Sequence, residues 1–270
     1  MVAALPRAAA LVEPLVAHLL AEMPERRAWE REFPRGDPAA RRLLLRALMN
    51  VRPPAPLDPG FLRDQDALLG AERDARGVVD ALALPPAPAD PRLAVWRGDI
   101  VRLGADAIVN AANDALLGCF APLHACIDNA IHSAAGLQLR DACAREVAAH
   151  GEGWRAPTGG AALTPGFNLP ARFVLHTVGP VVADGRPGEA QREALASCYR
   201  SCLAAAAAAG LRSVAFCCVS TGVFGYPAED AARVAVAAVR AALDAGSPVE
   251  RVVFDVFSAR DVSLYRSLLA

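Results

Sequence analysis

The sequence predicts an α/β fold, in which a mostly parallel sheet is covered by helices on both faces and preceded by a helical region. Two observations support this prediction. After residue 92, apolar stretches of five to seven residues alternate with helical patterns. Before residue 85, apolar residues recur only at helical spacing. Strands that are buried on both faces of a parallel sheet are continuous apolar runs, which matches the first observation.

The N-terminal region, residues 1–84, is predicted to be helical and to contain no strand. Its apolar residues recur three or four positions apart at 11–20 and 44–49, and a further helix is expected over Phe61–Leu69. A Pro-rich linker over residues 85–91 follows, with semi-rigid extension. We expect these helices to pack against the second region without carrying chemistry, because no Cys or metal-type cluster occurs among them.

The second region, residues 92–270, is predicted to contain the sheet. The expected strands are 93–97, 107–111, 173–178, 213–219 and 252–257. The expected helices are 127–134, 137–149, 190–209, 228–245 and 261–269. Ligands bind such sheets outside the carboxyl ends of the strands, so function should lie in the loops that follow them.

Composition excludes several classes of protein. The 270 residues carry a net charge of −1, and all 28 basic residues are Arg, so a general binder of nucleic-acid backbones is not expected. No apolar stretch reaches the length of a membrane span, and no signal peptide is predicted. Seven irregularly spaced Cys favour a reducing compartment, so a cytoplasmic location is expected.

The loop after residues 107–111 contains Cys119, His124 and Cys126. Two thiolates and one imidazole are ligand types that Zn²⁺ prefers, and three protein ligands leave a fourth coordination position open. Ordinary core cysteines and one incidental histidine are the alternative, because the spacing matches no standard zinc finger. His132, one helical turn after Asp128, is interpreted as a histidine satisfied by helix packing rather than as a ligand.

The loop Ser220–Tyr226 leads from a strand into a helix that has Pro227 near its first turn. Backbone N–H groups at a helix N-terminus attract phosphate, and the two aromatic rings of this loop can stack on a ribose or a base. An ordinary strand-to-helix turn explains its glycines equally well.

Polar residues also stand at the predicted strand ends. Asn110 and Asn113 offer amide donors and acceptors, although capping a turn is a common role for Asn. Asp99 can accept a hydrogen bond from a ligand amine or cap a helix or turn. Asp128 starts a helix, where the dipole favours a carboxylate in any case.

Four motifs in this order resemble the macrodomain family: residues 96–100, 108–113, 127–136 and 174–180. Most macrodomains carry a glycine-rich stretch between the second and third motifs, where this chain has Gly118–Cys126. In this replacement of the glycine-rich stretch the chain resembles the zinc-dependent subgroup of macrodomains. The N-terminal helical extension of that subgroup contains a segment like Leu44–Pro54. The resemblance implies a three-layer α/β/α macrodomain with a mixed, mostly parallel sheet.

The resemblance also implies roles for individual residues. It places Zn²⁺ on Cys119, His124 and Cys126. It makes Asp128 and Asn113 catalytic and assigns the ADP-ribose contacts to Asp99, Ile100, Asn113, Ser220, Thr221, Gly222, Val223, Phe224, Gly225 and Tyr226. Asp99 and Ile100 would lie at the adenine, with Phe257 as a weaker candidate for packing there. The main departure is Ser220-Thr221, where relatives commonly have Ser-Cys-Gly.

The implied activity is zinc-dependent removal of ADP-ribose from mono-ADP-ribosylated proteins, by hydrolysis of a glycosidic or ester linkage. A non-catalytic ADP-ribose reader module with a structural zinc is the alternative. A nucleoside deaminase is disfavoured, because its H-x-E and P-C-x-x-C signature is absent. The resemblance further suggests a sirtuin-type ADP-ribosyltransferase and a lipoyl carrier protein as partners, and no membrane.

Overall fold

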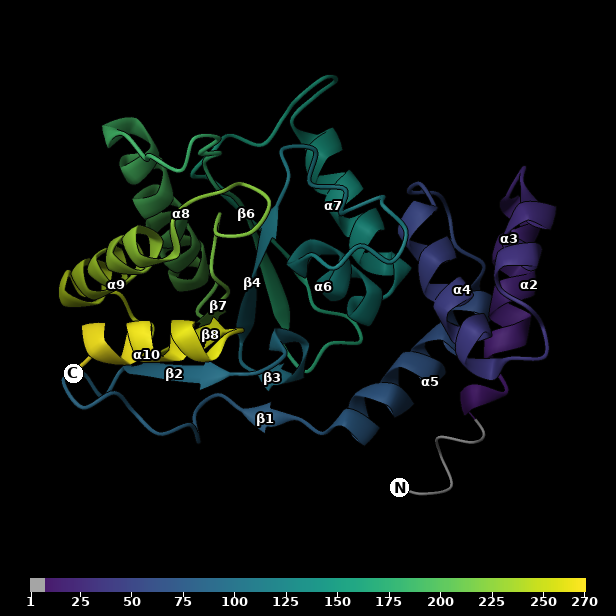
Figure 1. The fold of residues 1–270 in the computed structure, drawn as a ribbon, viewed down its shortest axis with the longest axis horizontal. Helices are drawn as coiled ribbons and strands as arrows, with labels where there is room; N and C mark the ends of the chain where they lie inside the picture. Colours follow the sequence, from purple (N-terminus) through teal and green to yellow (C-terminus); the bar gives the residue numbers. More distant parts are fainter. Residues whose placement is uncertain (1–7) are drawn as a thin grey trace.

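The computed structural model describes residues 8–270 and arranges them around a central sheet (Figure 1). The helices are α2 (Val12–Glu22), α3 (Arg26–Glu32), α4 (Pro38–Val51), α5 (Pro59–Arg76), α6 (Ile127–Ala135), α7 (Leu137–Ala149), α8 (Glu189–Ala208), α9 (Ala228–Asp244) and α10 (Ala259–Leu268). The strands are β1 (Val79–Asp80), β2 (Leu93–Arg97), β3 (Leu103–Gly104), β4 (Ala107–Ala112), β5 (Ala161–Pro165), β6 (Phe173–Val178), β7 (Ser213–Phe216) and β8 (Arg251–Val256). Within the described residues, no helix is long and apolar enough to span a bilayer.

The main sheet has six strands in the order β2-β8-β7-β4-β6-β5. Neighbouring strands are parallel except for β5, which pairs antiparallel with β6 at one edge. Helices α8, α9 and α10 cover one face, and α6 and α7 cover the other (Figure 1). The helical layers leave the strand ends free, so the loops that follow the strands can form a site.

Sequence patterns missed the edge strand β5 and extended β7 too far. Ala161–Pro165 is only half-buried for most of its length and ends in Pro, so it lacks the continuous apolar run of a central strand. The predicted strand at 213–219 ends at Phe216, although Cys217 and Val219 beyond it are buried. A buried loop can be as apolar as a buried strand, so an apolar run indicates burial. A strand also needs a hydrogen-bonded neighbouring strand.

The prediction that residues 1–84 contain no strand is wrong. Val79 and Asp80 form β1, which pairs in parallel with Leu103 and Gly104 of β3. Two residues are too few to show any periodicity, so only the tertiary structure shows this pairing. The Pro-rich segment 85–91 also lies against the fold, because Ala87 N–H donates to Leu93 O at 2.7 Å.

The N-terminal helices form a hydrophobic cluster of their own, and this cluster is completed by a residue of the second region. Leu137, at the start of α7, is buried among side chains of α2, α4 and α5. Helices α4 and α5 also contact α6. The N-terminal region therefore lies as an additional layer outside α6 and α7 (Figure 1).

Helix α4 is the centre of that layer. The Asp37 side chain accepts from the N–H groups of Ala39 and Ala40 and so caps the helix, with Pro38 in its first turn. One face of the helix buries Leu44, Leu45, Leu48 and Met49. Its buried Arg41 forms a two-pronged ion pair with Glu13, at 2.7 and 3.0 Å, which fixes α4 beside α2.

We predict that Leu48→Ala lowers the free energy of unfolding by about 2–5 kcal/mol, because it opens a cavity in the N-terminal cluster. Leu43→Ala, on the same helix, is the matched control: Leu48 is 0% exposed and Leu43 is 47% exposed. Urea unfolding of both variants measures the difference. Equal effects would show that the packing of α4 contributes little to stability.

Candidate functional site

The loops that follow β2, β8, β7 and β4 share one edge of the sheet, because these strands run parallel. Asp99, after β2, is exposed and accepts from Val101 N–H at 3.2 Å, so it caps a short 3₁₀ helix. The side chain of Ile100 is buried in the core, which leaves only its main chain to face a ligand. Phe257, after β8, is 87% exposed and lies beside β2, because its carbonyl accepts from Arg97 Nε.

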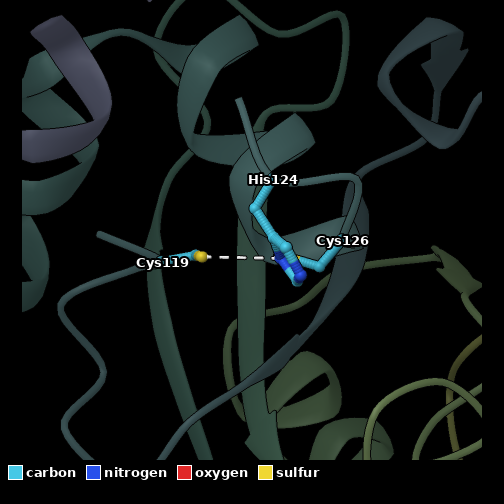
Figure 2. A group of neighbouring side chains, drawn as sticks. All are labelled: Cys119, His124 and Cys126. Atoms are coloured by element: carbon cyan, nitrogen blue, oxygen red, sulfur yellow. Dashed lines mark hydrogen bonds between the residues drawn. The ribbon is translucent and has the colours of Figure 1, made fainter. Parts of the chain in front are cut away.

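The loop after β4 brings three potential metal ligands together (Figure 2). The donor atoms of Cys119, His124 and Cys126 all lie within 4.8 Å of one another. Cys119 Sγ is 3.7 Å from His124 Nδ1. Tetrahedral zinc, with Zn–S of about 2.3 Å and Zn–N of about 2.0 Å, requires an S···N separation of about 3.6 Å. The donor set and its spacing therefore fit zinc.

Cys126 also caps the N-terminus of α6, because its Sγ accepts from Asn129 N–H at 3.4 Å. Burial raises the pKa of the Cys126 thiol to about 11, and the neighbouring Cys119 adds to the shift. Without a metal this thiol keeps its proton at neutral pH. A bound cation must displace that proton, and its own charge favours the thiolate.

A buried polar network lies beneath this loop. Asn110 Nδ2 donates to Asp128 Oδ1 at 2.8 Å and lies 3.2 Å from His176 Nδ1. His176 Nε2 is 2.8 Å from Thr164 Oγ1. Burial lowers the pKa of His176 to about 4, so its ring is neutral at physiological pH. The bonding fits a tautomer in which Nδ1 accepts from Asn110 and Nε2–H donates to Thr164.

Asp128 is held in this network at the start of α6 and is almost fully buried. Burial raises the pKa of Asp128 to about 6, and the hydrogen bond from Asn110 opposes the shift. The hydrogen bond from Asn110 fixes Oδ1 of the Asp128 carboxylate. Asn110 thus lies under the site instead of capping a turn, and its role is to orient a carboxylate.

His132 differs from its predicted role. It is buried in α6, but neither ring nitrogen has a hydrogen-bond partner among the described residues. Its Nε2 lies 3.4 Å from Asp128 Oδ1, without hydrogen-bond geometry. Burial lowers the pKa of His132 well below its usual value, so the ring is neutral. The predicted packing of His132 is confirmed by its burial, but the expectation that its ring nitrogens are satisfied is wrong.

Asn113 organises the start of the loop that carries Cys119, His124 and Cys126, the candidate metal-binding loop. Its Oδ1 accepts from Ala115 N–H at 3.0 Å, and its Nδ2 donates to Gly118 O at 3.2 Å. Gly118 has φ +81°, and a Cβ there would lie 3.0 Å from the His132 ring, so glycine is required. Asn113 therefore closes the turn that presents Cys119, and its second amide hydrogen remains for a ligand.

The loop Ser220–Tyr226 is closed by its own backbone. Tyr226 N–H donates to Ser220 O at 3.0 Å, and Val182 N–H donates to Phe224 O at 2.7 Å. Ser220 has φ +66°, and Gly225 has φ +70° with no room for a Cβ, which would lie 2.7 Å from Val182 O. Thr221 Oγ1 donates to Cys218 O at 2.9 Å.

This loop offers both polar and apolar groups to the site edge. The Ser220 and Tyr226 hydroxyls are buried without hydrogen-bond partners among the described residues, whereas the Val223 side chain is 81% exposed. Gly222 is exposed and Phe224 is half-buried. The fixed loop backbone therefore forms one wall of the site, with Val223 projecting from it.

Sequence reasoning missed Asp255, which lies near the end of β8 opposite Trp96 of β2. Its Oδ1 is buried without a partner among the described residues. Burial raises the pKa of Asp255 to about 8, and the charge of Asp99 adds to the shift. The signal was available, because Asp255 is the one charged residue in the otherwise apolar run 252–257.

We predict that Asp255→Asn stabilises the chain more at high pH than at low pH. In the unfolded chain the Asp pKa is about 3.9, so between about pH 4 and pH 8 only the folded state holds this proton, and stability falls as pH rises. Asn removes that dependence. Thermal unfolding at about pH 5 and about pH 9 should show a larger gain in midpoint at the higher pH. Asp184→Asn, at an exposed carboxylate, is the control, and an equal gain for Asp255→Asn at both pH values would contradict the assignment.

The chain matches known proteins over most of its length. The Macro domain family matches residues 109–235. A protein-ADP-ribose hydrolase of Treponema medium is 46% identical over 87% of this chain and 89% of that protein. One from Staphylococcus aureus (strain MSSA476) is 43% identical over 83% and 82%, respectively. A solved macrodomain of Trypanosoma brucei in complex with ADP-ribose is 35% identical, with a TM-score of 0.64 over 80% of this chain and 92% of that chain.

These similarities confirm the predicted α/β architecture with its mixed, mostly parallel sheet. They extend beyond the sheet, since the two bacterial relatives cover more than four-fifths of this chain. The chain belongs to the macrodomain family.

Proposed function

We propose that the protein is a protein-ADP-ribose hydrolase and that Cys119, His124 and Cys126 bind the zinc ion on which its activity depends. Two relatives that cover more than four-fifths of the chain bear the name protein-ADP-ribose hydrolase. The observation that carries the zinc proposal is the convergence of two thiols and one imidazole at the ligand edge of the sheet, within 4.8 Å of one another. This donor set leaves a coordination position for an oxygen ligand.

The reaction breaks the linkage between ADP-ribose and the protein. That linkage is either a glycosidic bond at the anomeric carbon of the distal ribose or an ester of the ribose. Cleavage at the anomeric carbon develops positive charge there and negative charge on the leaving oxygen. Zinc, when bound, supplies a positive charge that polarises an oxygen ligand at its open position. Two thiolates neutralise much of that charge, so the side chains around the site must contribute as well.

Asp128 is the group that we assign to proton transfer. Asn110 holds its Oδ1, which leaves Oδ2 to accept a proton from the attacking water. Asp128 lies two residues after Cys126, in the first turn of α6. The position of its carboxylate relative to Cys126 is therefore fixed by that helical turn. Holding water and the reacting carbon in one geometry removes part of the entropic cost of the reaction.

Binding groups for ADP-ribose lie along the rest of the edge. Asp99 follows β2 and Phe257 follows the neighbouring strand β8, and both are exposed, so this pair is assigned to the adenine. The Ser220–Tyr226 backbone is assigned to the diphosphate, because its N–H groups precede the N-terminus of α9. Asn113 follows β4, the neighbour of β7, and begins the loop that carries Cys119, so it is assigned to the distal ribose. The adenine and the reacting ribose are thereby held at opposite ends of one edge.

We predict that the protein binds ADP-ribose in preference to ADP, because only ADP-ribose places a distal ribose beside Asn113 and the metal loop. Asp99→Ala should weaken binding of both ligands by about 0.5–1.5 kcal/mol through the loss of one hydrogen bond. Calorimetry with the two ligands measures both effects. Equal affinity of the wild type for ADP and ADP-ribose would count against the assigned ribose contact.

We predict that Cys119→Ala, His124→Ala and Cys126→Ala each fold normally but lose zinc and most hydrolysis. The sheet has a large hydrophobic core of its own, so loss of the metal should not unfold the chain. Affinity for ADP-ribose should fall less than turnover, because the adenine and diphosphate groups lie on other loops. Cys202→Ala, at a buried thiol of α8, is the matched control and should keep zinc and activity.

Metal content, thermal midpoint and release of ADP-ribose from a modified protein are measured side by side for these four variants. Retained turnover in a variant shown to be free of zinc would overturn the catalytic role of the metal and leave Asp128 as the main candidate. Tight binding of ADP-ribose by the zinc-loaded wild type, with no release from any modified protein, would instead identify a binding module.

A further inference from the structure

The N-terminal helices contact the metal-binding loop directly, although they contribute no metal ligand. We propose that Asn50 of α4 is a positioning residue, which holds the loop in the conformation that brings Cys119, His124 and Cys126 together. This inference rests on the proposed zinc site. It gives the N-terminal region a part in function that its amino-acid composition does not indicate.

Asn50 is 1% exposed, and both ends of its amide are used across the boundary between the two regions. Its Oδ1 accepts from Leu123 N–H at 3.0 Å, and its Nδ2 donates to Ser133 Oγ of α6 at 3.0 Å. A buried amide with two such bonds has little freedom to move. Asn50 thus joins the loop to the helix that follows it.

Leu123 is the residue just before the ligand His124, and its backbone is in an uncommon conformation. Its φ is +56°, in the left-handed region that disfavours a leucine side chain. Two contacts hold it there: the hydrogen bond to Asn50, and packing of its side chain against the N-terminal hydrophobic cluster. Since His124 itself is exposed, its direction depends on the backbone at Leu123.

A second contact from α4 reaches the same loop through Asn129. Arg46 Nη2 donates to Asn129 Oδ1 at 2.8 Å, and Asn129 Nδ2 donates to Ala121 O at 3.1 Å. Asn129 is fully buried, and its own N–H is bonded to Cys126 Sγ. This path therefore connects α4 both to the middle of the loop and to one metal ligand.

A third contact fixes the beginning of the loop. Arg140 of α7 donates to Leu117 O at 2.8 Å and, through Nη1, to Met49 O and Arg52 O at the end of α4, at 2.9 and 2.6 Å. Its guanidinium also lies 4.3 Å from the centre of the Phe120 ring. Leu117, Phe120, Ala121 and Leu123 of the loop are thus tied to α4, directly or through one side chain.

These contacts matter because a short loop with one exposed and two half-buried ligands must otherwise be ordered by the metal itself. A loop that is held before the ion arrives has less conformational freedom to lose on binding, so its affinity is higher. Among the contacts that α4 makes directly with the loop, the bond from Asn50 to Leu123 is the one adjacent to a ligand in sequence. Its removal should therefore weaken metal binding without removing any group that touches the metal or the substrate.

The test compares zinc affinity and loop order in three variants of the full chain. Asn50→Ala should lower zinc affinity about tenfold, measured by competition with a chelator. Asn50→Asp keeps the acceptor for Leu123 N–H, and Ser133 can donate to its other oxygen in exchange for its 3.3 Å bond to Asn129 Oδ1. Affinity should therefore return to within about twofold of wild type. Leu19 is a fully buried residue of α2, so Leu19→Ala destabilises the N-terminal cluster but leaves the bond from Asn50 to Leu123 in place. Its zinc affinity should also stay within about twofold of wild type.

Two further readouts separate positioning from catalysis and from folding. Hydrogen exchange over residues 118–126 in the zinc-free protein should be at least about tenfold faster in Asn50→Ala than in wild type or Asn50→Asp. With zinc in excess, Asn50→Ala should regain turnover close to that of wild type, because no reacting group has changed.

Unchanged zinc affinity and unchanged exchange in Asn50→Ala would overturn the inference, even if the wild type binds zinc as proposed. A loss of affinity in Leu19→Ala as large as that in Asn50→Ala would also overturn it, because general destabilisation would then explain both. If the wild type binds no zinc, the proposed metal function fails, and the exchange of the zinc-free protein still decides whether Asn50 orders the loop.

Discussion

The parallel direction of β2, β8, β7, β4 and β6 is the constraint on which the rest of the site depends. It brings the loops that follow these strands to one edge, while helices cover both faces of the sheet. Residues that are far apart in the sequence, such as Asp99, Asn113 and Ser220, consequently line the same edge. The fold thus supplies a surface at which a long ligand with two different ends can be held along several loops.

The second constraint is the buried hydrogen-bond network around Asn110, below this edge. Asn110 bridges Asp128 and His176, and Thr164 completes the bonding of the His176 ring. An unpaired buried polar group is costly, so such a network has few alternative arrangements. The position of the Asp128 carboxylate is therefore set by residues from three strands, and not by α6 alone.

Much of the fold could be predicted from the sequence because the central strands are buried on both faces. Each is a mostly apolar run, as in residues 173–178 apart from His176 and Thr177, and this pattern is local. The metal ligands could be proposed for a similar reason: they lie within eight residues of one another, so chain connectivity limits how far apart they can be. The edge strand β5 and the two-residue strands β1 and β3 carry no comparable local pattern.

Contacts between distant residues could not be predicted in this way. Asn50 and Leu123 are separated by 73 positions, and nothing near either residue indicates the bond between them. The same is true of Asn110 and His176, which pair only because β4 and β6 are neighbours in register. A helical region without metal ligands was therefore expected to have no part in the chemistry, although the structure places its central helix against the metal-binding loop.

The central claim of this account is that hydrolysis depends on one zinc ion held by the Cys119, His124 and Cys126 loop. The most direct measurement is to remove metal from the wild-type protein with a chelator and return zinc in small steps, following bound zinc and ADP-ribose release together. The account predicts that turnover rises in proportion to bound zinc and stops rising at one ion per chain. Full turnover by the zinc-free protein, or a rise that continues beyond one ion per chain, would contradict it.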